Sequence, residues 1–216
     1  MTTTTNDRTA SFFDGYAGGF NAIYGNNNTL INRFVNKAFR GAMRERFERT
    51  IAGCTPIEGA SVLDVGCGPG HYGVALAKAG AKEVLGLDFA AGMLDTARKN
   101  AAGAGVTDRC TWQEGDFVLT EFGRKFDFTI VMGFMDYMAD PIAVVQKAAQ
   151  VTQKRAFFSF PSEGGFLAWQ RKLRYKSRCD LYLYTERHVD AIMRHTGKRF
   201  TIDSLGRDHF VTLYAE

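Results

Sequence analysis

Apolar positions recur along the chain with two different periods, and the change of period predicts its elements. Apolar side chains first recur every four residues, at Phe39, Met43, Phe47 and Ile51, which predicts one long amphipathic helix over residues 29–52. After that helix, short apolar runs of strand length alternate with helical segments. The predicted strands cover 61–65, 83–88, 110–113, 126–132 and 155–160, and the predicted helices cover 71–78, 91–104 and 141–151.

The last part of the chain follows another pattern. A predicted helix over 185–195 precedes two strands, 199–204 and 209–214, and the tight turn between these strands permits only an antiparallel pair. The earlier alternation of strands and helices with short links predicts a parallel sheet covered on both faces. We therefore expect an α/β fold: a Rossmann-like, doubly wound, seven-stranded sheet, mostly parallel, with a C-terminal antiparallel hairpin and an N-terminal helical cap.

Composition narrows the class of protein. The 216 residues are 45% apolar and include 18 phenylalanines, enough for a sizeable core. No run of about 18 apolar residues is present, so we expect no membrane span, and the polar N-terminus without a secretion signal predicts a cytoplasmic protein. The net charge of +4 is too mild to indicate nucleic acid. The spacing of the four cysteines predicts neither a metal site nor a disulfide framework. These cysteines are Cys54, Cys67, Cys110 and Cys179.

The long helix carries many charges on its other face. The basic residues there are Arg33, Lys37, Arg40, Arg44, Arg46 and Arg49. Glu45 and Glu48 offset them, so we expect a solvated face with Arg–Glu pairs. The alternative is a face that attracts an anionic substrate.

A glycine loop follows the first predicted strand, and it has two interpretations. Ligands of open parallel sheets bind beyond the carboxyl ends of the strands, and glycines there let a ligand approach the backbone. The segment 68–73 matches the dinucleotide fingerprint GxGxxG, with Asp88 twenty residues after Gly68, which indicates a nicotinamide- or flavin-dependent oxidoreductase. Against this, the turn begins earlier, at Gly66, and the terminal hairpin is unusual for a dinucleotide domain.

Taken whole, the segment Val62–Gly70 resembles the first motif of the class I S-adenosylmethionine-dependent methyltransferases. The resemblance covers residues 61–160 and extends to the hairpin. Within this family the chain is similar to the magnesium-protoporphyrin and ubiquinone-pathway methyltransferases, although that similarity transfers no substrate. The resemblance to the family implies that residues 60–216 form a domain that binds S-adenosyl-L-methionine as cofactor. We expect a tail, lid segment and helix over residues 1–59 and a basic cap insertion at about 162–184.

The resemblance also implies a set of cofactor contacts. Asp88 would bind both ribose hydroxyls, Asp116 would meet the adenine amine, and Met132 would lie beside the sulfonium. Apolar side chains would line the adenine slot, and the motif and the N-terminal lid would supply the rest. These remaining positions are Asp64, Gly66, Cys67, Gly68, Gly70, Phe89, Met93, Phe117 and Tyr16.

Methyl transfer from a sulfonium is a direct displacement, so the enzyme mainly aligns the acceptor and excludes water. A base is needed only for a protonated acceptor. The first candidates are Asp136 and Tyr137, because they directly follow the strand that carries Met132, and His71 is the next. Glu163 and His209 are further options.

The acceptor is predicted from charge. Residues 165–178 contain five bases and no acid, which favours an anionic small molecule, a metabolite or glycan precursor methylated on oxygen or nitrogen. The alternative is a basic surface helix with apolar side chains packed inward. An RNA- or protein-directed methyltransferase and a nicotinamide-dependent oxidoreductase remain open alternatives. We expect a monomer or homodimer.

Overall fold

The computed structural model describes residues 30–164 and 181–216. Its strands are β1 (Ser61–Val65), β2 (Glu83–Asp88), β3 (Cys110–Glu114), β4 (Phe126–Val131), β5 (Thr152–Pro161), β6 (Arg199–Leu205) and β7 (Asp208–Tyr214). Its α-helices are α3 (Leu30–Gly53), α4 (His71–Lys78), α5 (Ala91–Gly103), α6 (Pro141–Val151) and α8 (Glu186–Arg194). Two short 3₁₀ turns lie at Thr107–Arg109 and Met135–Tyr137.

The strands form one seven-stranded sheet in the order β3-β2-β1-β4-β5-β7-β6. The first five strands are parallel, and β7 lies antiparallel between β5 and β6. This topology confirms the predicted fold, including the terminal hairpin. The strand order reverses between β1 and β4, so the crevice beyond their carboxyl ends is where the fold accepts a ligand.

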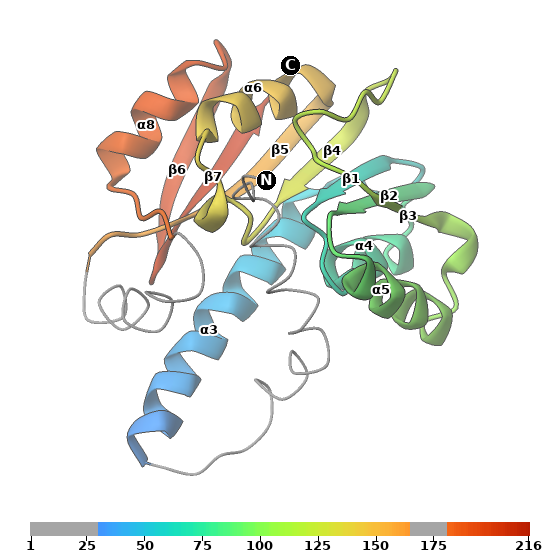
Figure 1. Cartoon of the computed structure of the whole chain (residues 1–216), viewed down its shortest axis with the longest axis horizontal. Helices are drawn as coiled ribbons and strands as arrows, with labels where there is room; N and C mark the ends of the chain where they lie inside the picture. The colour runs from blue at the N-terminus through green and yellow to red at the C-terminus, as the bar shows by residue number, and fades with distance from the viewer. Residues whose placement is uncertain (1–29, 165–180) are drawn as a thin grey trace, which may run out of the picture.

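The helices cover both faces of the sheet (Figure 1). On one face, side chains of α4 such as Leu76 and Ala77 pack with Val62 and Phe128 of the strands. On the opposite face, Val145 of α6 belongs to the core formed with Leu63, Phe158 and Val211, and Val189 of α8 belongs to it as well. Neighbouring strand residues such as Val62 and Leu63 thus enter opposite cores, as the two-residue period of a strand requires.

The predicted boundaries agree with the structure to within a few residues, with the largest difference at β5. This strand begins at Thr152, directly after α6 ends at Val151, instead of at residue 155. Thr152 donates its hydroxyl to the carbonyl of Ala148 and contacts the hydroxyl of Thr129 on β4. The Thr152 side chain thus contacts both the last turn of α6 and strand β4, and α6 passes into β5 without a loop.

Candidate functional site

The loop between β1 and α4 has a backbone that requires glycine. Gly66, Gly68 and Gly70 have φ values of 61°, 50° and 76°, in the left-handed region that L side chains rarely adopt. The Cys67 N–H donates to the carbonyl of Leu87 at the end of β2. The loop therefore turns sharply and remains attached to the neighbouring strand.

Gly70 and two further glycines, Gly73 and Gly86, make room for the ring of Trp112. A Cβ on Gly70 would lie 2.5 Å from the ring of Trp112, and one on Gly73 would lie 3.2 Å from it. Gly86 on β2 has the same ring against its backbone. The third glycine of the apparent GxGxxG segment thus serves the packing of α4 on the sheet. A lone tryptophan on a short strand gave no signal of this arrangement.

A pocket of about 310 Å³, counting its opening to solvent, lies beyond the carboxyl ends of β1, β2 and β3. It is lined by Gly66, Leu87, Asp88, Phe89, Gly115, Asp116, Phe117, Phe134 and Met138. Five predicted cofactor contacts therefore come together here: Gly66, Asp88, Phe89, Asp116 and Phe117. Phe134 and Met138, which lie in the turn that follows β4, were not predicted as cofactor contacts.

Both pocket acids are held by backbone N–H groups. Asp88 is buried, and its two carboxylate oxygens accept from Gly68 N at 2.8 Å and Ala90 N at 2.9 Å. Asp116 accepts from Val118 N at 2.8 Å. These bonds fix the orientation of both carboxylates.

Asp64 lies under the loop on the α4 side. Its carboxylate is buried and accepts from Gly73 N at 3.0 Å. Burial raises the pKa of Asp64 to about 7, the Gly73 hydrogen bond lowers it, and the charge of Asp88 raises it further. Burial also raises the pKa of the nearby Cys67 thiol, to which Asp64 and Asp88 add, so this cysteine is no thiolate nucleophile.

The other predicted cofactor residues lie around this pocket. Gly68 has open space where a Cβ would stand, Met93 is buried in the first turn of α5, and Met132 is buried directly after β4. None of these three lines the pocket itself. Tyr16 and the lid around it, together with Cys179 and the basic stretch 165–178, lie outside the described residues. The roles of these residues remain predictions.

The catalytic candidates are dispersed. Asp136 is buried and Tyr137 half-buried in the turn after β4, whereas His71 is exposed at the first residue of α4 and Glu163 is exposed after β5. His209 is buried on β7, with Nε2 3.2 Å from the carbonyl of Tyr184. Only Asp136 and Tyr137 thus directly follow the strand beside the pocket.

Among the α3 side chains that the structure describes, Arg46 departs from the expected solvated face; those of Arg33, Lys37 and Arg40 lie outside them. The pairs Arg44–Glu48 and Arg49–Glu45 are exposed as predicted. The side chain of Arg46, in contrast, is only 11% exposed and forms an ion pair with Asp208 of β7 at 3.1 Å. The prediction was wrong for Arg46 because this position faces the sheet, one turn before the fully buried Thr50.

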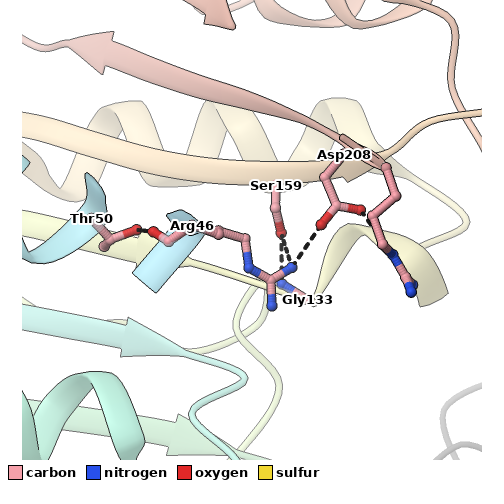
Figure 2. A network of polar contacts seen from close by, with 6 residues as sticks. Arg46, Thr50, Gly133, Ser159 and Asp208 are labelled. Atoms are coloured by element: carbon pink, nitrogen blue, oxygen red, sulfur yellow. Dashed lines mark hydrogen bonds and ion pairs between the residues drawn. The ribbon is translucent and has the colours of Figure 1, made fainter. Parts of the chain in front are cut away.

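Arg46 belongs to a polar network at the ends of three strands (Figure 2). Its Nη1 donates to Ser159 of β5 at 3.3 Å as well as to Asp208, and Gly133 N after β4 donates to the same Ser159 hydroxyl at 2.8 Å. Burial lowers the pKa of Arg46, but interactions with Tyr72 and Asp208 outweigh burial and hold that pKa above its ordinary value. Arg46 Nε is buried without a hydrogen-bond partner in this part of the structure.

Comparisons with known proteins agree with this geometry. Residues 62–155 match a family described as a methyltransferase domain. The ubiquinone biosynthesis O-methyltransferase of Actinobacillus pleuropneumoniae is 40% identical over 92 residues, which are 41% of this chain and 39% of that protein. The enzyme of the same name from Neisseria meningitidis is 37% identical over 114 residues, 50% of this chain and 47% of that protein. The chain thus spans less than half the length of these curated relatives.

A solved structure extends the likeness of fold. The magnesium protoporphyrin IX methyltransferase of Synechocystis, crystallised with bound S-adenosylhomocysteine, superimposes with a TM-score of 0.77. It is 20% identical, and the match covers 95% of this chain and 97% of that one. Residues 62–155 thus match a methyltransferase domain, and the comparisons support the class I S-adenosylmethionine-dependent methyltransferase fold that the sequence predicts.

The described residues form neither a cluster of metal ligands nor a membrane-spanning helix. Within residues 30–164 and 181–216, no three His, Cys, Asp or Glu side chains are grouped as metal ligands would be. None of the helices in those ranges combines the length and apolar character needed to cross a lipid bilayer.

Proposed function

We propose that this protein transfers the methyl group of S-adenosylmethionine to an oxygen or nitrogen of a small anionic acceptor. The observation that carries the proposal is the pocket over β1–β3, where a glycine backbone, two fixed carboxylates and aromatic rings converge. The match of residues 62–155 to a methyltransferase domain supports the same conclusion.

The residues of the pocket fit the proposed cofactor. Asp88 is held by two backbone N–H groups, so its carboxylate is already oriented to accept hydrogen bonds from a ribose diol. Phe89, Phe117 and Phe134 form apolar walls suited to an adenine ring, with Asp116 as the polar group at its edge.

The protein contributes orientation and exclusion of water. When bound, the cofactor would supply a methyl group on a positively charged sulfur. An electron-rich acceptor atom would bond to that methyl carbon while the carbon–sulfur bond breaks, and S-adenosylhomocysteine would leave as a neutral thioether. The turn after β4 stands beside the pocket and would hold the acceptor in line. Asp136, buried in that turn, remains the first candidate to take a proton from the acceptor where one must leave.

The anionic acceptor is supported by charge. The basic stretch 165–178 follows β5 in the sequence. Five cations without an acid favour a carboxylate or phosphate on the acceptor.

Calorimetric titration tests this function. We expect S-adenosylmethionine and S-adenosylhomocysteine to bind the wild-type protein and NAD not to bind. Asp88→Ala should weaken both by about 100-fold, because it removes two charge-assisted hydrogen bonds. Asp95→Ala is the matched control, since Asp95 lies on α5 but is exposed and paired with Arg98.

The acceptor is tested by screening acidic metabolites and their neutral esters with labelled methyl donor. We expect incorporation into the acids. Binding of NAD in place of the sulfur nucleosides would overturn the cofactor, and transfer to neutral esters alone would overturn the anionic acceptor.

A further inference from the structure

The turn that follows β4 forms one wall of the cofactor pocket. Phe134 and Met138 of this turn line the pocket, and a Cβ on Gly66 would lie 2.5 Å from the Phe134 ring. The edge of the same ring faces Phe117, with centroids 6.5 Å apart. Any change in the conformation of the turn therefore changes the shape of the pocket.

The first residue of the turn is fixed by Ser159. Gly133 has a φ of 69°, and its N–H donates to the Ser159 hydroxyl at 2.8 Å. Arg46 donates to the same hydroxyl at 3.3 Å. A hydroxyl oxygen has two lone pairs, so Arg46 occupies one of them and the other is directed at Gly133. Figure 2 shows the three groups converging.

The rest of the turn is held by the segment that precedes α8. Tyr182 N donates to the carbonyl of Asp136 at 2.9 Å, and the Tyr184 hydroxyl donates to the carbonyl of Met135 at 3.2 Å. The turn is thus held by α3 through Arg46 and Ser159, and by residues 182–184 through their own bonds. Both elements lie outside the βα units that form the pocket.

Arg46 brings one unsatisfied donor into the interior. Asp208 and Tyr72 stabilise its charge, but its Nε is buried and lacks a hydrogen bond in the described structure. A buried donor without a partner costs free energy, and such departures from local rules are concentrated at functional sites. Arg49, one turn along, reaches β6 through an exposed pair with Asp203, so attachment of α3 to the sheet does not require a buried charge.

We propose that Arg46 is a positioning residue for methyl transfer, which holds the Gly133–Met138 turn through Ser159 in the conformation that completes the cofactor pocket. Docking of α3 and binding of the cofactor therefore stabilise each other, because both act on one turn. This inference rests on the proposed function for its role in methyl transfer.

Hydrogen exchange and calorimetry test the proposal on the full chain, with S-adenosylhomocysteine as the probe. In Arg46→Met and in Ser159→Ala, amides of residues 133–138 should exchange at least about tenfold faster, and the probe should bind about tenfold more weakly, within the range of coupling between sites. Arg49→Met is the matched control, and it should change neither quantity by more than about twofold.

Ser159→Ala keeps the Arg46–Asp208 ion pair, so it separates positioning of the Gly133–Met138 turn from the stability that the ion pair provides. It tests the hydrogen bond to the turn even if Arg46→Met does not fold. Unchanged exchange and affinity in Ser159→Ala, whatever the melting temperature, would overturn the proposal. Failure of the proposed function would give a different result. The wild-type protein would then not bind S-adenosylhomocysteine, whereas hydrogen exchange of residues 133–138 would still report on Arg46.

Discussion

The helices beside the pocket and the helices on the opposite face of the sheet begin in different ways. In the β1–β3 half of the sheet, α4 and α5 start at Gly70 and Ala90, which provide no side-chain cap. In the β4–β7 half, α6 is capped by Asp140 through Ala143 N, and α8 by Thr185 through His188 N. The third N–H of α4 donates instead to Asp64 of β1, so α6 and α8 begin on their own N-cap side chains, whereas α4 begins on an acid that another element supplies.

Charge differs between the two halves as well. The β1–β3 half holds its acids, Asp64, Asp88 and Asp116, on backbone N–H groups. The β4–β7 half buries an Arg46–Asp208 pair of opposite charges. Acids held by backbone are oriented for a ligand, whereas a paired arginine and aspartate neutralise each other and fix the ends of strands. Three predictions test how the two halves differ.

The largest effect is expected in the β4–β7 half. Asp208→Ala leaves Arg46 as a buried charge without its carboxylate, which should lower the free energy of unfolding by about 3–5 kcal/mol. Asp203→Ala breaks the Arg49 pair, whose side chains are 44% and 53% exposed, and should cost only about 0–1 kcal/mol. Urea unfolding of both variants measures the difference. Equal losses would show that burial of the pair is irrelevant.

The next effect concerns the glycine loop. Gly70→Ala places a methyl group against Trp112 and in a left-handed conformation, so it should cost about 2–4 kcal/mol. Gly68→Ala meets only the conformational cost, because nothing lies within 4 Å of its Cβ position, and about 1 kcal/mol is expected. Thermal and urea unfolding compare the two. A Gly68 variant as unstable as the Gly70 variant would contradict the role of the tryptophan ring.

The third prediction concerns a change of stability with pH in the β1–β3 half, instead of a loss at a fixed pH. The pKa of Asp64 is raised by burial to about 7 in the folded protein, above its ordinary value in the unfolded chain. The folded state then binds the extra proton, so the stability of the wild type relative to Asp64→Asn should fall as pH rises from about 4 to 7, by up to about 1.4 kcal/mol per unit, and level off above 7.

Unfolding of both proteins in urea between pH 4 and 8 provides this comparison. Asparagine keeps an oxygen to accept from Gly73 N, so the hydrogen bond is matched and only the titration is lost. A constant difference between the two proteins across this range would mean that Asp64 is not titrating near neutrality.

The elements that the sequence predicted well are those specified by local pattern. Strand runs, helix periods and the Gly66–Gly70 loop depend on neighbours in the chain, and the pocket residues Asp88 and Phe117 follow directly from strand ends. Arg46 could not be placed in this way, because the helical period assigned it to the solvated face and its partner lies 162 residues away. The contact of Phe134 with Gly66 likewise arises from the spatial order of β1 and β4.

The position of β7 has a consequence for synthesis. This strand enters the sheet between β5 and β6, and it carries the counter-charge of Arg46. During synthesis, β1, β2 and β3 leave the ribosome before β7, so Arg46 of α3 cannot meet its counter-charge until every other described strand has been made. We therefore expect the glycine loop and its acids to form before the wall that Arg46 fixes.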